Sequence, residues 1–240
     1  MPEIFSGYSI EKDAWNWWWA MNSYTNWRWY ETMSEEDRNI LSQIEWLSQE
    51  EANKILIPFL ENKYSNNREE IDEAAMQIKI KLDTQKDKIL RLMEKLTKRP
   101  IFNENFHIWY TTCKRCPYNR RAWEIWMTDP LEKSWRLRAW SWVFTHELLH
   151  FQTHNYYENE YPLNKLNRRQ FNLIKESLTF LLNHEFPWVN LSTDKWYPQH
   201  QKFREYLENY WLSWWSKKDF EDLINFGCFY ILKNKLLSEE

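Results

Sequence analysis

The most informative part of this 240-residue chain is the stretch Asp129-Pro-Leu-Glu-Lys-Ser-Trp-Arg-Leu-Arg-Ala-Trp-Ser-Trp-Val-Phe-Thr-His-Glu-Leu-Leu-His150. Aspartate is a favoured residue just before a helix, and proline is favoured at the first helical position, so a helix is predicted to begin at its start. We expect this helix to continue to about Tyr156. Its middle, from Ala139 to Phe144, is apolar nearly all round, which indicates a helix buried at the centre of the protein.

Two segments before this helix are rich in aromatic and β-branched residues, namely Phe106–Thr112 and Ala122–Thr128. Such a composition is typical of strands. The segment between them, Cys113–Arg120, contains proline and asparagine and is interpreted as a connecting loop. We therefore predict a small antiparallel β-hairpin in front of the central helix.

The rest of the chain is predicted to be helical, because it has only two glycines and eight prolines and is rich in residues that favour helices. Two expected helices begin at capping boxes, one after Ser34 and one from Ser48 to about Asn62. The other expected helices are Arg68–Lys98, Arg168–Asn183, Gln201–Ser216 and Asp219–Lys233. The expected fold class is thus mainly α with a small antiparallel β-hairpin or sheet, that is, α+β.

Composition excludes several classes of function. The 32 basic residues nearly balance the 35 acidic ones, which argues against a dedicated binder of nucleic acid or of anionic membranes. Two glycines, Gly7 and Gly227, cannot build a dinucleotide fingerprint, a phosphate-binding loop or a nucleophile elbow. Three cysteines are too few for a disulfide scaffold. Without a signal peptide or a long apolar run, we expect a cytoplasmic protein that does not bind a membrane.

The central helix carries the most informative motif, His146-Glu147-Leu-Leu-His150. Residues four apart lie on one face of a helix, so both imidazoles can reach a single metal ion. Glu147 lies beside that pair, where it could take a proton from a water molecule at the metal. The pattern is the HExxH motif of zinc peptidases. The competing interpretation is a set of solvated charges on a helix.

A catalytic zinc ion needs a third protein ligand. His154 is an unsuitable ligand, because three ligands at successive turns from His146 would span about 12 Å of helix axis. Glu176 is the better candidate, since it lies in an apolar helical segment and an unpaired buried carboxylate is costly. The competing interpretation places Glu176 on a wet helix face.

His146-Glu-Leu-Leu-His150 followed by Glu176 on the next helix resembles the gluzincins, zinc metallopeptidases with two His ligands and one Glu ligand. The spacing is also similar to that of compact ImmA/IrrE-type and minigluzincin-type proteins. The resemblance covers about residues 104–185. One position differs: many gluzincins have an Asp that orients the first His at the position where this chain has Phe180. Thr179, Asn172 and Asn183 are alternative partners for that role.

The resemblance implies a zincin-like core in which His146, His150 and Glu176 bind one Zn²⁺ per chain and Glu147 activates water. The substrate would be a peptide or protein, held by strand addition at the hairpin edge. Peptidases of this kind supply a Tyr or His to stabilise the oxyanion. Tyr197 and His200 are the candidates for that role, and His184 and Tyr157 are rivals. A Trp-rich helical region over residues 1–100 would precede this catalytic region, 101–240, unless the two form one continuous domain.

Two other hypotheses remain open. In a helical bundle with two metal ions, the pairs Glu104/His107 and Glu147/His150 would supply ligands with Glu176 as a bridge, which requires residues 104–107 to be helical. In a non-catalytic regulatory protein, the HExxH helix would bind zinc without turnover. The pair Cys113 and Cys116 is interpreted as part of a plain loop, and the N-terminal Trp run as core packing. The oligomeric state is not predicted.

Overall fold

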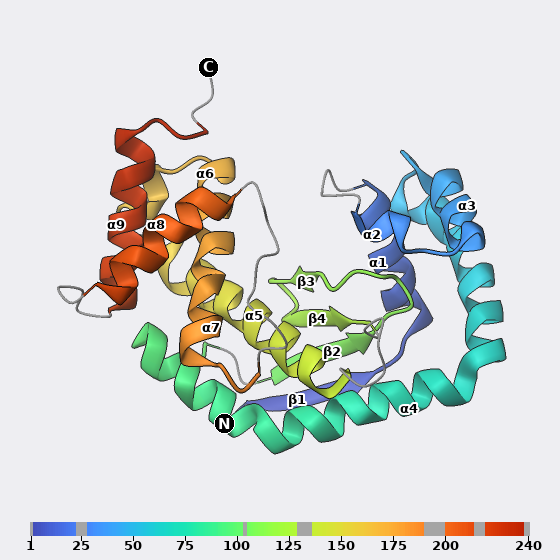
Figure 1. Cartoon of the computed structure of the whole chain (residues 1–240). Coiled ribbons are helices and arrows are strands. Elements are labelled where there is room, and N and C mark those ends of the chain that lie inside the picture. Colours follow the sequence, from blue (N-terminus) through green and yellow to red (C-terminus); the bar gives the residue numbers. More distant parts are fainter. Residues whose placement is uncertain are drawn as a thin grey trace. The chain divides into compact units, whose positions relative to one another are not determined.

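The computed structural model describes residues 2–22, 28–102, 105–128, 136–189, 200–213 and 219–237 (Figure 1). Its elements in chain order are β1 (Glu3–Gly7), α1 (Ile10–Asn22), α2 (Arg28–Glu31), α3 (Glu35–Ile44), α4 (Gln49–Thr97), β2 (Asn105–Tyr110), β3 (Tyr118–Asn119), β4 (Glu124–Met127), α5 (Arg136–Tyr157), η2 (Leu163–Lys165), α6 (Arg168–Ser177), η3 (Leu178–Phe180), α7 (Leu181–Glu185), α8 (Gln201–Leu212) and α9 (Phe220–Lys233). The chain is mainly helical with one small sheet, which confirms the expected α+β class. None of the helices in the described ranges is long and apolar enough to cross a membrane.

Two compact units make up the fold. One comprises Met1–Thr84 and Asn103–Val143, and the other comprises Gln85–Phe102 and Phe144–Glu240. Helices α4 and α5 each contribute to both units. Strands β2 to β4 belong to the same unit as the N-terminal helices, and the HExxH sequence belongs to the other unit.

The sheet of the first unit has four strands in the order β1-β2-β4-β3 (Figure 1). Strands β1, β2 and β4 are parallel, and only the short β3 is antiparallel to its neighbour β4. In β2 every second side chain is buried, as the period of a strand requires. β1 is an additional strand, too short to stand out from the sequence.

The predicted antiparallel hairpin is therefore wrong, because its two segments form the parallel strands β2 and β4. Parallel pairing needs a long connection, and residues 111–123 provide it. Its first residues are tied to α1: the hydroxyl of Thr111 donates to Asp13 at 2.5 Å, and the backbone N–H of Thr112 donates to the same carboxylate at 3.2 Å. These bonds hold the segment after β2 against α1, before the chain continues to β4. A local turn signal in the sequence does not predict such a long-range contact.

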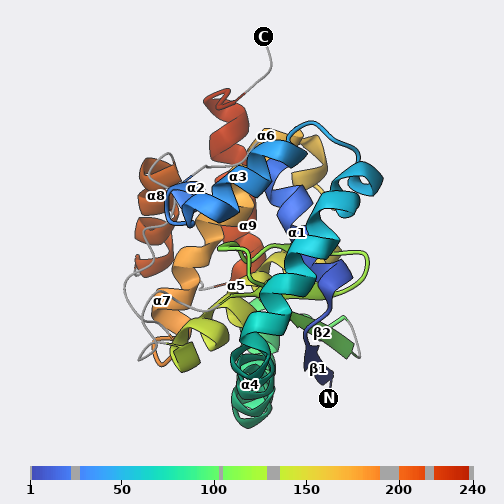
Figure 2. The ribbon, with the colours of Figure 1, turned by 90° about the vertical axis from the view of Figure 1, so that its right-hand side faces the viewer.

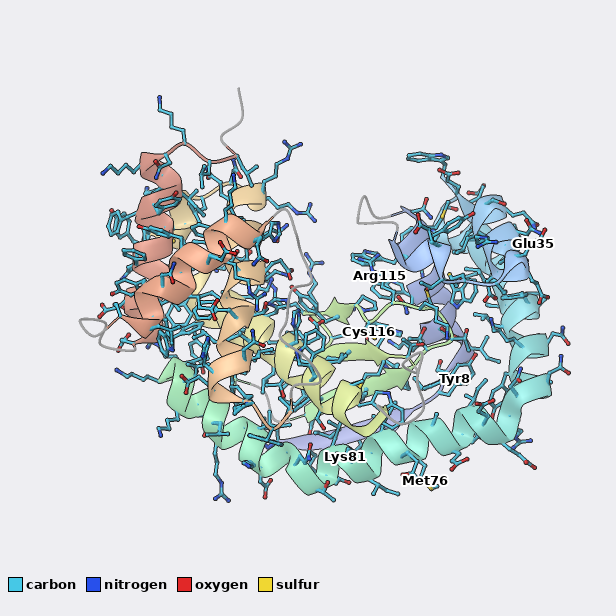
Figure 3. All side chains as sticks on the ribbon, in the orientation of Figure 1. Tyr8, Glu35, Met76, Lys81, Arg115 and Cys116 are labelled. Carbon is cyan, nitrogen blue, oxygen red and sulfur yellow. The ribbon has the colours of Figure 1, made fainter. Side chains whose placement is uncertain are left out.

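Buried apolar side chains of α1, α3 and the first half of α4 form the core of the first unit, and Figure 2 shows α3 beside α1. Trp17 is fully buried there and Trp15 stacks on Trp126 at 4.5 Å. The expected packing role of the N-terminal Trp run is thus confirmed for Trp17. On α4, Ile78 is buried while Met76 lies on the outer face and points away from the strands (Figure 3).

The starts of α3 and α4 agree with the capping signals of the sequence. The Ser34 hydroxyl accepts the N–H of Asp37, and Ser48 and Glu51 form a reciprocal capping box. The two helices expected on either side of residues 62–68 are joined into α4, which carries a kink at Asn67 (φ −130°). The start of the central helix at Asp129 lies outside the described residues.

The second unit packs α6, α8 and α9 against one another. Gly227 of α9 lies close to this contact, since a Cβ atom there would be 3.1 Å from Leu207 of α8 and 3.7 Å from Ile174 of α6. Asp219 caps α9 by accepting the N–H groups of Glu221 and Asp222. This bundle supplies α6, the helix that carries Glu176.

Candidate metal centre

Helix α5 places the two histidines of the HExxH sequence one above the other. Their ring centroids are 4.4 Å apart and the rings are nearly perpendicular. His146 is 6% exposed and His150 is 1% exposed. Burial of two imidazoles on one helical face argues against the interpretation of solvated helix charges, because histidine is not usually fully buried.

Glu176 reaches the same place from α6. This helix begins at a capping box between Asn167 and Gln170 and buries Phe171 and Ile174 on one face. Glu176 lies in its last turn, where the helix tightens into η3. Its carboxylate is largely buried, with a side-chain exposure of 16%. The interpretation that placed Glu176 on a wet face is wrong.

The three side chains offer donor atoms that converge. Oε2 of Glu176 lies 3.4 Å from Nε2 of His150 and 3.9 Å from Nε2 of His146. All three donor atoms lie within 4.8 Å of one another. Ligands at the usual zinc distances of about 2.0–2.2 Å in tetrahedral geometry lie about 3.3 Å apart. The donor set and its spacing therefore fit a zinc ion with two His ligands and one Glu ligand.

The electrostatics also suit metal binding. Burial lowers the pKa of His150 well below its usual value, and the neighbouring Lys175 ammonium acts in the same direction. Burial alone would raise the pKa of Glu176, but the Lys175 ammonium and the two imidazoles outweigh it and hold that pKa well below its usual range. At neutral pH the imidazole of His150 is therefore neutral and the carboxylate ionised, which are the states that metal ligands require.

Glu147 follows His146 on α5 and is buried, with 7% of its surface exposed. A glutamate is almost never buried to this degree unless it is paired or functional. Its neighbour in sequence, His146, is a member of the cluster, and both side chains are buried. A buried carboxylate has the chemistry that the predicted general base requires.

His200 is the residue before the first turn of α8 and is half-buried. Burial lowers its pKa, which the charge of Glu176 opposes and that of Lys175 supports, so His200 is within electrostatic reach of both. His200 thus interacts electrostatically with one member of the cluster, Glu176. Tyr197 lies outside the described residues.

The other candidate side chains are engaged elsewhere. His154 lies 3.2 Å from Glu158, and His184 lies 2.6 Å from Glu208. The hydroxyl of Tyr157 donates to the carbonyl of Thr97 at 2.9 Å. The contacts of His184 and Tyr157 that the structure shows are thus with residues outside the cluster.

Thr179 is one of three residues predicted to orient His146. In the structure it makes hydrogen bonds with a residue of α6 and a residue of α8. Its hydroxyl donates to the carbonyl of Glu176 at 2.8 Å and accepts from Arg204 at 3.0 Å. Asn172 is exposed and Asn183 is half-buried. Thr179 supports the backbone of Glu176.

Lys175 is a member of the site that the sequence interpretation missed. It is 6% exposed, and its Nζ lies 2.7 Å from Oε1 of Glu176. A signal for it exists in the sequence, since Phe171, Ile174 and Leu178 form an apolar stripe at helical spacing and position 175 belongs to that stripe. A lysine at a core-facing position predicts a buried ion pair.

The two remaining metal signals are not supported by the structure. Residues 105–107 lie on strand β2 and are not helical, as the two-metal hypothesis requires of them, and Glu104 lies outside the described residues. Cys113 is fully buried in the core of the first unit, and neither Cys113 nor Cys116 is part of a disulfide. Across the described ranges, no second set of three His, Cys, Asp or Glu side chains converges in this way.

Comparison of the chain with protein-family models, with curated proteins and with solved structures gave no match.

Proposed function

We propose that this chain is a zinc-dependent metallopeptidase that hydrolyses peptide bonds at the cluster of His146, His150 and Glu176. The convergence of one donor atom from each of these side chains to within 4.8 Å carries the proposal. The order of the ligands along the chain, with two on the HExxH helix and one on the next helix, resembles that of the gluzincins. A compact zincin-like core and a single Zn²⁺ per chain are parts of the same proposal.

Bound zinc supplies Lewis acidity, which makes water nucleophilic near neutral pH and polarises a carbonyl group. The protein's own contribution is proton transfer by Glu147. Its carboxylate takes a proton from the water that adds to the peptide carbonyl, and it returns a proton to the nitrogen of the leaving amine as the C–N bond breaks. Burial of Glu147 keeps bulk water from competing for that proton.

His200 is the candidate to stabilise the negative charge that develops on the carbonyl oxygen. It is half-buried and interacts electrostatically with Glu176. A side chain with a hydrogen-bond donor at such a position lowers the energy of the tetrahedral intermediate. Tyr197 is the alternative from the sequence.

The experiment is the variant Glu147→Gln, assayed on an unfolded protein and on a peptide library. We expect the zinc content to stay unchanged and the rate of hydrolysis to fall about 10²- to 10⁴-fold, as for loss of a general base. Glu158→Gln, a change of the same type just after α5, is the control and should keep the wild-type rate. Undiminished hydrolysis by Glu147→Gln would contradict the role of Glu147. Zinc binding without any turnover in the wild type would favour the non-catalytic regulatory protein.

A further inference from the structure

Lys175 forms an unusual ion pair with the residue next to it. Adjacent side chains on a helix point in different directions and do not normally meet. Here the Lys175 ammonium lies 2.7 Å from Oε1 of Glu176, and the lysine side chain is only 7% exposed. Burial of a lysine is costly unless a carboxylate compensates its charge. The pair therefore fixes the lysine in one conformation.

The two oxygens of Glu176 have different neighbours. Oε1 lies against the Lys175 ammonium, while Oε2 lies 3.4 Å from His150 and 3.9 Å from His146. Rotation of the carboxylate toward the imidazoles would break the ion pair. The lysine thus selects which oxygen is presented to a metal ion.

Glu176 lies where α6 passes directly into η3 and α7, so helical backbone continues on both sides of it. The carbonyl of Glu176 accepts the N–H of Leu178 and the hydroxyl of Thr179. These bonds hold the backbone of Glu176, and Lys175 supplies the positive charge that holds its carboxylate.

We propose that Lys175 is a positioning residue that holds Glu176 by Oε1, so that the metal ion is bound by Oε2 alone and keeps a coordination position open for water or substrate. The inference rests on the proposed metal centre. A carboxylate bound through one oxygen leaves two imidazoles, one oxygen and one open position, which is the arrangement of catalytic zinc. Bidentate binding of Glu176 would occupy that fourth position.

The direct test is a crystal structure of the zinc-loaded wild-type protein. We expect Oε2 of Glu176 on the zinc ion and Oε1 within hydrogen-bond distance of Lys175. Both carboxylate oxygens on the zinc ion would overturn the proposal, whatever the variants do. A protein that takes up no zinc would overturn the metal centre and this inference together.

The variant test uses cobalt(II) in place of zinc, because four-coordinate cobalt absorbs visible light far more strongly than five-coordinate cobalt. Lys175→Met keeps an unbranched side chain, one atom shorter, but removes the charge. We expect its cobalt spectrum to weaken and its kcat/KM to fall about 10- to 100-fold, as for other residues that orient metal ligands. Lys175→Arg restores a cation and should give the wild-type spectrum. Lys202→Met, at an exposed position of α8, is the matched control and should also be unchanged.

The possible results separate this inference from the proposed function. If Lys175→Met has the wild-type cobalt spectrum while Glu147→Gln is inactive, the role of Lys175 is wrong and the peptidase proposal stands. If Lys175→Met changes the spectrum but the wild-type protein hydrolyses nothing, Lys175 positions Glu176 in a metal site that is not a peptidase. Circular dichroism of each variant checks that it is folded.

Discussion

Glu176 has a buried negative charge that lies between the Lys175 ammonium and two imidazoles. Each partner compensates the cost of removing the other from water. When one member of a buried ion pair is lost, the remaining charge is left uncompensated, and this costs about 3–5 kcal/mol. The stability of α6 in the metal-free protein therefore depends on the pair and not on either residue alone.

We predict that Glu176→Gln lowers the free energy of unfolding of the metal-free protein by about 3 kcal/mol, because Lys175 is left as a buried cation. The double variant Lys175→Met/Glu176→Gln should recover most of this loss. Urea unfolding in the presence of a chelator measures both values. Equal stabilities of Glu176→Gln and the double variant would show that the loss does not come from an uncompensated charge on Lys175.

At the residue scale, the sequence was sufficient to select the cluster but not the ion pair. Helical spacing predicts that His146 and His150 share a face, and the apolar segment around Glu176 indicates that it points inward; the structure brings all three together. Lys175 was missed because neighbours in a helix are not expected to pair. The position of Tyr197 is outside the described residues, so its role stays a prediction.

At the scale of the element, α9 depends on the residue that caps it, Asp219. Asp219 accepts the N–H groups of Glu221 and Asp222 at 2.9 and 3.2 Å, and it also pairs with Lys98. Burial acts to raise the pKa of Asp219, but Lys98 and these N–H groups outweigh it and hold the pKa below its usual value. The stabilising contribution of this charge is therefore present above the ordinary carboxyl pKa and is lost as the pH falls through the lowered value.

We predict that Asp219→Ala lowers the free energy of unfolding by about 1 kcal/mol at neutral pH, the usual value of a helix cap. The difference from the wild type should shrink as the solution is made strongly acidic, because the wild-type carboxylate then becomes protonated. Asp219→Ser, which keeps a capping oxygen, should lose less. Chemical unfolding at a series of pH values tests this, and a difference that grows on acidification would refute it.

Gly227 controls the contact of α9 with α8 and α6. A Cβ atom at this position would lie 3.1 Å from Leu207 and 3.4 Å from Phe203. We predict that Gly227→Val lowers the free energy of unfolding by about 1–3 kcal/mol through overpacking. Phe229→Val, at an exposed position of the same helix, should have a much smaller effect. A thermal unfolding curve that is unchanged by Gly227→Val would show that the helices have room to move apart.

Most helices could be predicted from the sequence, whereas the sheet could not. Ser34, Ser48 and Asp219 begin α3, α4 and α9 as their capping signals indicate. The two halves of α4 remain one helix because only Asn67 leaves the helical conformation. The segment that connects β2 to β4 is bound to Asp13, 98 residues away from Thr111 along the chain, and local patterns contain no information about such contacts.

At the scale of the whole molecule, the chain is divided into two compact units, and the candidate metal ligands all belong to the second. The division could not be found from the sequence, because α4 and α5 are each continuous through a unit boundary and leave no linker. A metal ion bound by the second unit should stabilise that unit by mass action, by about 4 kcal/mol at a free concentration 1,000 times its Kd.

We predict that addition of zinc slows amide hydrogen exchange in α5 and α6, while the strands of the first unit change little. Mass spectrometry of peptides after deuterium labelling, with and without zinc, gives the result segment by segment. The same experiment on His150→Ala should show no zinc effect. Equal protection of both units would argue against a site confined to the second.

The most direct test of the proposed metal centre is the zinc content of the purified protein, measured by elemental mass spectrometry. We predict about one zinc ion per chain in the wild type and almost none in His146→Ala or Glu176→Ala. His154→Ala, a histidine on the same helix that pairs with Glu158, should keep its zinc. Absence of zinc from the wild type after it has been supplied, or equal zinc in all four proteins, would contradict the metal centre on which the proposed function depends.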